Sequence, residues 1–454
     1  MSINFNKKED KALQFATSGN KKRSVMNLWN AAIVASFVFA CLAFGAVFTT
    51  VLTFNLLAFA FFTYKVFAVV IGYRNDNDSE EMVEISDSLP TYCILLPLRD
   101  EPPQLSKRLF SELDKLNYPK SKLDIVVLID NDDKYRDHYS KLQLPSHYRI
   151  EVAEECFPMT KPKVCNVGLY STEAEYVVIY DAEDKPDPDQ LLKVLYKFEN
   201  TNAECVQCQL HYENKDATMV SRFFNLEYLL HWRMMIWGTK RMQGENAVIP
   251  LGGTSQHLRT STLKEVGGWN SYNVTEDCDL GIHLSRMGKN IILSESTTSE
   301  FAVDDIWTWI KQRTRWQMGF LMTYMLHTDD IVSLVRDLGI YRFIHFMFLT
   351  IGSLINPLIT PPLFFIYFGY YVFGWFSAAA EHAGVFALGW VTLIGNLLLV
   401  TLSSIIASYR YDKSRYIIVA IISYFYHLLS VVSAYRAVYK YMTCLLYTSD
   451  AADE

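Results

Sequence analysis

The chain has 454 residues, a formal net charge of −7 and 50% hydrophobic residues, so it can form one sizeable domain together with a membrane part. Its mildly acidic balance and the lack of a Lys/Arg-rich block argue against a nucleic-acid partner. Cys205 and Cys208 form a lone CxxC with no second pair, and the other cysteines are mostly scattered. We therefore expect reduced, cytosol-facing thiols rather than a zinc site.

The N-terminal region predicts a hairpin of two transmembrane helices. Residues 1–26 are polar and include the basic cluster 21–23, and an almost uninterrupted apolar tract follows over residues 27–73. Because a helix needs ~20 residues to cross a bilayer, this tract is long enough for two crossings with a turn near Thr49-Thr50. The basic cluster places the N-terminus in the cytoplasm, and the hairpin returns the chain to that side at Arg74.

A soluble domain is expected after this hairpin. Residues 74–90 form an acidic, polar linker, and residues 91–330 alternate short apolar strands with helical stretches. This alternation is typical of an α/β domain whose mostly parallel sheet is covered by helices on both sides. The expected strands are Tyr92–Leu96, Leu123–Ile129 and Tyr176–Tyr180, and the expected helices are Leu105–Leu116, one around Leu169, and Pro188–Phe198.

Acidic side chains follow the strands of this domain. Glu101 comes after the first strand, Asp130, Asp132 and Asp133 come after the second, and Asp181 comes after the third. In parallel sheets, ligands bind beyond the carboxyl ends of the strands. These acids are therefore expected to share one pocket.

The most informative stretch is Asp181-Ala182-Glu183-Asp184, which ends a buried strand of β-branched residues. Carboxylates at positions i and i+2 share a face, so Asp181 and Glu183 can point at one ion. Hard oxygen ligands suit Mg²⁺ or Mn²⁺, which usually keeps several waters and binds a substrate phosphate. For so short a motif, an acidic turn after a strand is the alternative.

Three further polar stretches each allow two interpretations. Thr160–Asn166 is a basic loop before a helix, and it could be a solvated turn. Thr275-Glu276-Asp277 could cap and charge the start of a helix, with Asp279 close behind. Gln312–Trp316 could be a basic and aromatic belt at the bilayer surface.

After residue 330 the chain becomes apolar again, over residues 331–444. The segment 343–376 is too long for one simple transmembrane span and contains three prolines. We therefore expect it to be kinked or to begin with a helix that lies in the membrane interface. Val385–Ala407 is a clear span, while Ile417–Val432 is shorter and a doubtful crossing.

Two details complete the C-terminal region. Arg410, Lys413 and Arg415 place the loop that they occupy in the cytoplasm. Residues 445–454 do not continue the preceding helical pattern and resemble translated sequencing-adapter sequence, so we expect a non-native tail.

In this order and spacing, the motifs resemble the membrane-bound glycosyltransferases of family 2, the relatives of cellulose, chitin and hyaluronan synthases. Thr275-Glu276-Asp277 is similar to the TED motif of that family, and Gln312-Arg313-Thr314-Arg315-Trp316 is similar to its Q(Q/R)xRW motif. The resemblance covers roughly Thr91 to Phe320. It implies an α/β GT-A-like cytosolic domain, the nucleotide-diphospho-sugar transferase fold, flanked by transmembrane helices.

The sequences of other stretches look closest to those of bacterial exopolysaccharide and biofilm-matrix transferases. These stretches are Asp181–Leu191, Leu251–Ser255 and Gly267–Trp269. One departure concerns the usual DxD motif, which is here Asp181-Ala182-Glu183 with Asp184 beside it. Either Glu183 or Asp184 therefore accompanies Asp181 at the metal.

The resemblance also implies a role for each motif. Asp277, together with Thr275 and Glu276, forms the catalytic motif, and its carboxylate is the candidate general base. Forked donors and a cation must stabilise the leaving diphosphate. The implied metal ligands are Asp181, Glu183 and Asp184, and the implied substrate-binding residues are Glu101, Asp132 or Asp130, Lys161, Asn166, Asp181, Gly253, Thr254, Gln312, Arg313, Arg315 and Trp316.

These roles predict an inverting hexosyltransferase in the bacterial inner membrane, with its catalytic domain in the cytosol. The donor would be a nucleotide sugar, expected to be UDP-linked, and the product a growing β-linked exopolysaccharide. Further expected partners are Mg²⁺ or Mn²⁺, membrane lipid and accessory secretion proteins. The alternatives are a single-sugar transferase with a lipid-linked, glycolipid acceptor, and a non-catalytic membrane scaffold or phage-adsorption component.

Overall fold

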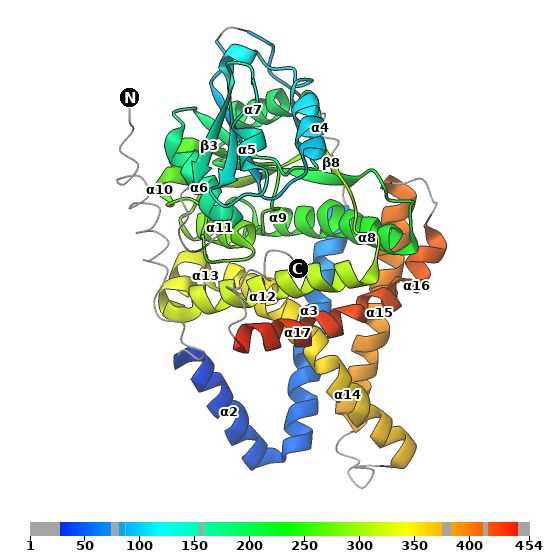
Figure 1. Ribbon diagram of the computed structural model, residues 1–454. Helices are drawn as coiled ribbons and strands as arrows, with labels where there is room; N and C mark the ends of the chain where they lie inside the picture. Colours follow the sequence, from blue (N-terminus) through cyan, green and yellow to red (C-terminus); the bar gives the residue numbers. More distant parts are fainter. Residues whose placement is uncertain are drawn as a thin grey trace.

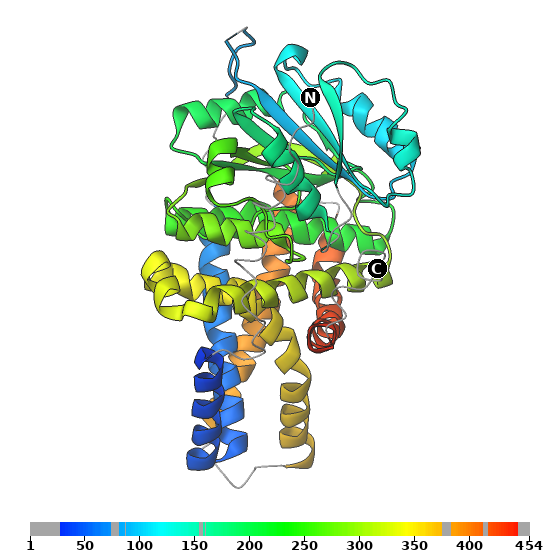
Figure 2. The ribbon, with the colours of Figure 1, turned by 60° about the vertical axis from the view of Figure 1, so that its left-hand side comes forward.

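The computed structural model describes residues 28–73, 81–86, 88–153, 158, 160–374, 383–411 and 416–443. A sheet domain lies at one end, helices run crosswise beneath it, and long helices extend from the opposite side (Figures 1 and 2). Several expectations fall outside the described residues. They concern segment 1–26, most of the linker after Arg74, the loop with Lys413 and Arg415, and the tail 445–454.

The sheet has eight strands in the order β3-β2-β1-β4-β7-β6-β8-β5. β3, β2, β1 and β4 are parallel, whereas β7 runs antiparallel to both of its neighbours. The sheet is therefore mixed, and β7 escaped the sequence pattern because its four residues, Gln256-His257-Leu258-Arg259, contain no apolar run. The strands are β1 Tyr92–Leu98, β2 Leu123–Asp130, β3 Tyr148–Ala153, β4 Tyr176–Ile179, β5 Lys185–Pro186, β6 Cys205–Tyr212, β7 Gln256–Arg259 and β8 Ile291–Glu300.

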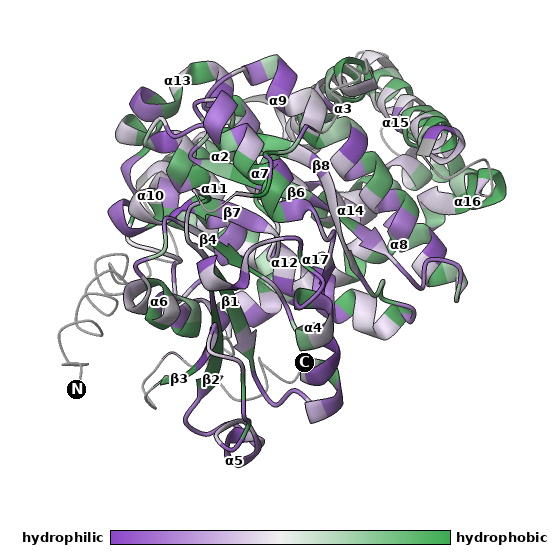
Figure 3. Ribbon diagram, turned by 90° about the horizontal axis from the view of Figure 1, so that it is seen from above, coloured by the Kyte–Doolittle hydropathy of each residue, from purple (hydrophilic) through white to green (hydrophobic). Residues whose placement is uncertain are grey.

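The central strands are apolar on both faces, because helices cover the sheet from both sides. Along β1, Ile94 and Leu96 join the core beneath α4 (Pro103–Leu113) and α7 (Gln190–Asn200). Leu95, between them, joins the opposite core. Figure 3 shows the apolar colour of the central strands. The second core is covered by α6 (Lys161–Ser171), α10 (Thr260–Glu265) and α11 (Glu276–Arg286).

In the described part of the chain, four helical stretches are long and apolar enough to cross a membrane. They are Phe48–Tyr73, Ile306–Phe373, Gly384–Arg410 and Ile417–Met442. These stretches include the long helices α3 (Ala46–Tyr73), α14 (Ser353–Phe373) and α15 (Ala383–Tyr411), and the shorter helix α2 (Leu28–Phe44) lies beside α3.

The first two helices meet at Gly45, so the expectation of a turn near Thr49-Thr50 was wrong. Both threonines lie inside α3. Gly45 has a φ of 86°, a left-handed conformation that glycine adopts without the steric penalty of a Cβ atom.

Several helices run crosswise between the sheet and the long helices. They are α8 (Met219–Leu230), η2 (His231–Ile236), α9 (Trp237–Gln243), α12 (Ile306–His327), η3 (Thr328–Asp330), α13 (Ile331–Met347) and η4 (Phe348–Gly352). The last helix breaks at Leu428 into α16 (Ile417–His427) and α17 (Leu429–Met442). α17 then packs along α12 through Ala434 and Met318 (Figure 1).

The sidedness of the chain remains a prediction. We expect the sheet domain to face the cytoplasm because basic clusters flank it on that side. A membrane-impermeant maleimide applied to intact cells or spheroplasts should label Phe373→Cys, at the far end of α14, and miss Lys107→Cys, which is exposed on α4. The unsubstituted chain gives the background. Labelling of Lys107→Cys without permeabilisation would reverse this topology.

Candidate active site

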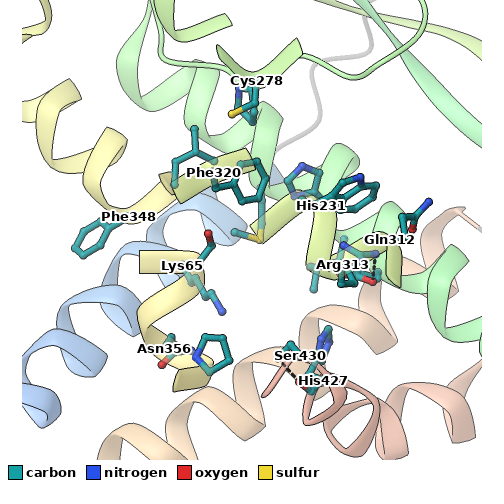
Figure 4. A pocket seen from close by; sticks show the side chains of 18 of the residues that line it. Lys65, His231, Cys278, Gln312, Arg313, Phe320, Phe348, Asn356, His427 and Ser430 are labelled. Carbon is teal, nitrogen blue, oxygen red and sulfur yellow. Dashed lines mark hydrogen bonds and ion pairs between the residues drawn. The ribbon is translucent and has the colours of Figure 1, made fainter. Parts of the chain in front are cut away.

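A cavity of about 1520 Å³ begins at the carboxyl edge of the sheet and continues between the long helices. Asp132, Asp181 and Glu183 line its mouth. Tyr367 and Trp390 line it deep between α14 and α15. Figure 4 shows labelled side chains of α3, η2, α12 and α14 around this space. The strand-end acids and the long apolar helices therefore line one continuous cavity.

Lys161, at the start of α6, neutralises the first of the acids. Its Nζ lies 2.5 Å from Asp181 Oδ1 and donates a hydrogen bond of 2.9 Å to the carbonyl oxygen of Gly253. Burial favours the neutral amine, but Asp181 and Glu276 outweigh it and raise the pKa of Lys161. Lys161 therefore remains a fixed positive charge in the mouth of the cavity.

Further carboxylates crowd the same place. Burial, with Asp181 nearby, raises the pKa of Glu183, and burial with Glu183 and Asp181 nearby raises the pKa of Glu101. Burial and Glu183 also raise the pKa of Glu300 to about 8. Sequence reasoning missed Glu300, which ends β8, because the largely polar Ser294–Glu300 gives no strand signal. The cluster favours a bound cation, since like charges this close destabilise one another.

The donor set fits Mg²⁺ or Mn²⁺ in part. Within the described ranges, no three His, Cys, Asp or Glu side chains are grouped so that they could enclose an ion. Mg²⁺ commonly uses one or two carboxylates and takes its other ligands from water and substrate phosphates. The carboxylates of Asp181 and Glu183, which both line the cavity, match that pattern.

Asp184 occupies a different place from its two neighbours. It is buried, and its Oδ2 accepts a 2.6 Å hydrogen bond from the backbone N–H of Asp181 and another from Thr254 Oγ1. Burial and Asp181 raise the pKa of Asp184 well above its usual range. Asp184 and Thr254 thus support the acidic turn from inside, and of the two alternatives at the metal the geometry favours Glu183.

The Thr275-Glu276-Asp277 motif lies at the start of α11. Thr275 is the N-cap residue, without a side-chain capping bond, and Asp277 lines the cavity. Burial and the neighbouring Glu276 raise the pKa of Asp277 to about 7. A Cβ atom on Gly253 would lie 3.4 Å from Asp277 Oδ2, so glycine keeps that side of the carboxylate open. The motif both begins a helix and presents a carboxylate whose pKa suits proton transfer near neutral pH.

The two arginines of the Gln312–Trp316 motif lie on α12 and face different partners. Arg315 lies near enough to Glu183, Glu276 and Asp277 to lower the pKa of each of them, against the effect of burial. Arg313 instead pairs with Glu227 of α8 at 2.8 Å, and its guanidinium carbon lies 4.2 Å from the centre of the Trp316 ring.

Glu227, which sequence reasoning missed, also accepts a hydrogen bond of 2.9 Å from the hydroxyl of Tyr426 on α16. Gln312, Arg313, Arg315 and Trp316 all line the cavity. Arg315 is therefore the arginine that is positioned toward the acids, and Arg313 joins α12 to α8 and α16.

α11 and α12 are in close contact beside the motifs. A Cβ atom on Gly319 of α12 would lie 2.3 Å from Thr275 Oγ1, so only glycine fits there. Asn273 Nδ2 donates to Thr323 Oγ1 at 2.7 Å, and His327 Nε2 lies 2.9 Å from Asp279 Oδ1. The TED motif and the QxxRW helix are thereby held as one unit.

Four residues of the expected site lie outside the cavity lining: Glu101, Asp130, Asn166 and, as described above, Asp184. Asn166 is buried, donates to the carbonyl oxygen of Trp269 at 2.7 Å and accepts from its N–H at 2.9 Å, so it fixes the loop before α11. Asp130 is buried near Arg99 and Lys163, whereas Asp132 lines the cavity. Of the two alternatives for the nucleotide, the geometry favours Asp132.

The chain belongs to glycosyl transferase family group 2, whose family model matches residues 176–409. It is 25% identical over 316 residues to the probable glycosyltransferase YdaM of Bacillus subtilis, covering 66% of this chain and 74% of that protein. It is also 25% identical over 254 residues to the β-monoglucosyldiacylglycerol synthase of a Nostoc species, covering 55% of this chain and 53% of that protein. With a probable glucomannan 4-β-mannosyltransferase of rice it shares 22% identity over 61% of this chain and 48% of that protein.

The chain thus spans about half the length of two of these three relatives. Among solved structures, the mannosyltransferase PcManGT from Pyrobaculum calidifontis, in complex with GDP-Man and Mn²⁺, superimposes with a TM-score of 0.53. The match has 15% identity and covers 86% of this chain and 99% of that one. It shows that the sheet domain has a GT-A-like fold.

The position of Asp277 predicts its effect on turnover. Asp277→Asn keeps the shape of the side chain but cannot accept a proton, so turnover should fall about 10²-fold or more while donor affinity persists. In the unsubstituted protein, turnover should rise as the pH passes about 7, because the carboxylate form of Asp277 is populated only above its raised pKa. Both are measured as initial transfer rates, beside nucleotide affinity on the same samples.

Asp279→Asn is the matched control, because Asp279 faces His327 rather than the cavity. Glu276→Gln tests whether loss of any neighbouring negative charge has the same effect. Near-normal transfer by Asp277→Asn would exclude it as the base and leave it only a role at the start of α11, worth a few tenths to ~1 kcal/mol of stability.

Proposed function

We propose that the protein transfers a sugar, with inversion, from a nucleotide-diphosphate donor to the end of a growing β-linked exopolysaccharide. The observation that carries this proposal is the continuity of the cavity from Asp277 to Tyr371 and Trp390 between α14 and α15. A polymer that grows at the mouth of such a cavity can leave through its deep part.

The residues of the mouth divide the chemistry between them. When Mg²⁺ or Mn²⁺ is bound, it would neutralise charge on the leaving diphosphate. Asp181 and Glu183 would hold that ion, and Arg315 and Lys161 would add fixed positive charge beside it. Asp277 would take the proton of the acceptor hydroxyl. Trp316 offers an apolar ring face against which a sugar can stack.

A specific observation favours a second candidate, a single-sugar transferase acting on a lipid-linked acceptor. Much of the deep cavity wall is apolar, including Phe61, Phe348 and Leu399. One relative is named a β-monoglucosyldiacylglycerol synthase. The complete set of acids, TED and QxxRW residues argues against a scaffold without activity.

The setting forms part of the same proposal. The chain would lie in a bacterial inner membrane as a multi-pass protein, with the sheet domain in the cytosol and a UDP-linked sugar as donor. Accessory secretion proteins would take up the polymer beyond the membrane. The four candidate spans support the membrane location.

Sizing the products separates the two acceptors. Membranes containing the protein, incubated with a panel of radiolabelled nucleotide sugars, should give a ladder of products from one donor. An Asp277→Asn membrane preparation supplies the matched blank. A single added sugar on extractable lipid would contradict polymer growth and favour the second candidate. No incorporation from any donor would contradict both.

The metal has its own test. Transfer should require Mg²⁺ or Mn²⁺, and Asp181→Asn should abolish it, because the ion would lose a ligand on the same face as the diphosphate. Glu183→Gln should be impaired too, if Glu183 is the second ligand. Transfer that persists in excess chelator would rule out the metal, and full, metal-dependent activity of Glu183→Gln would move the second ligand to Asp184.

A further inference from the structure

Lys65 is a charged residue in the membrane part of the cavity. It lies on α3 eight residues before that helix ends at Tyr73, which corresponds to ~12 Å along the helix axis. Its side chain points into the cavity across from α14 and α17 (Figure 4). A lysine at this depth is costly unless it serves a ligand or an ion path.

No carboxylate among the described residues forms an ion pair with Lys65. Its Nζ lies 4.5 Å from the centre of the Phe61 ring. The acids that line the cavity belong to the sheet domain, to α11 and to α8, and Glu227, on α8, is paired with Arg313. The positive charge therefore faces the open cavity.

Uncharged polar groups surround the same space. Asn356 of α14 and Asn396 of α15 line the cavity, and their side-chain amides make no hydrogen bond to other described residues. Unpartnered amides inside a membrane require water or a polar ligand. Together with the rings of Tyr367 and Trp390, they suit a polyhydroxylated chain better than an alkyl chain.

We propose that Lys65 binds an acidic group, a carboxylate, on the glycan as it passes, so that the polymer made by this protein is an acidic polysaccharide. This inference rests on the proposed function, because it requires a glycan in the cavity. The carboxylate would accept charge-assisted hydrogen bonds from Nζ, which neutral sugars cannot reproduce to the same strength.

The test uses the full chain in lipid nanodiscs and two matched probes. Cellohexaose and its C6-oxidised form differ only at C6, where a carboxylate replaces each hydroxymethyl group. Quenching of tryptophan fluorescence reports binding, since Trp316 and Trp390 line the cavity. The oxidised probe should bind the unsubstituted protein more tightly. Lys65→Gln should weaken it about tenfold, the loss of one charge-assisted hydrogen bond, and leave cellohexaose unchanged.

Lys65→Arg should keep the preference, and Lys107→Gln, on exposed α4, is the matched control for removing a lysine. Gel filtration checks folding, with Lys65→Met as the replacement if Lys65→Gln does not fold. Equal binding of both probes, or a preference that survives Lys65→Gln, would overturn the proposal. Lys65-dependent binding of dodecyl phosphate that is tighter than binding of the oxidised probe would also overturn the proposal, because it would assign the site to a lipid phosphate. The binding assay contains no sugar donor, so its result does not depend on sugar transfer. A failure of this proposal can therefore be distinguished from a failure of the proposed function, which the transfer assay tests.

Discussion

The balance between half-buried carboxylates and a few fixed cations is the interaction on which this site depends. Asp181, Glu183, Glu101 and Glu300 crowd the carboxyl edge of the sheet, and Lys161 lies 2.5 Å from one of them. Burying so much like charge is unfavourable without a counter-charge. This arrangement favours a diphosphate that arrives together with a cation, so the charges of the site and the recognition of the proposed donor are linked.

The cavity changes its chemistry along its length. Its mouth is lined by acids, arginines and a lysine, and its deep part by aliphatic side chains, aromatic rings, amides and the single lysine of α3. Ionic groups at the mouth suit a charged donor, whereas stacking and hydrogen bonding in the deep part would suit the growing glycan of the proposed function. A moving chain requires many weak contacts rather than one strong site, and Lys65 is the described position where a stronger contact would form.

The parts of the fold that sequence predicted are those encoded by local apolar pattern. β1, β2 and β4 are continuous apolar runs, so their positions and the acids that follow them could be predicted. β7 is short and polar, and the turn at Gly45 depends on a single glycine inside an apolar tract. Neither could therefore be predicted from the apolar pattern. The partners of Arg313 and Asn166 come from segments distant in sequence, Glu227 and Trp269, and only the packed chain reveals them.

The contact between Gly319 and Thr275 has a consequence for how the membrane acts on the chemistry. Since no side chain fits between Gly319 of α12 and Thr275 at the start of α11, the two segments are in direct contact there. α12 lies crosswise above the long helices and packs against α17 (Figure 2). If α12 lies at a bilayer surface, as the proposed function requires, a tilt of α12 would be transmitted through this contact toward Asp277, two residues after Thr275. In that setting, turnover would depend on the lipids that surround α12.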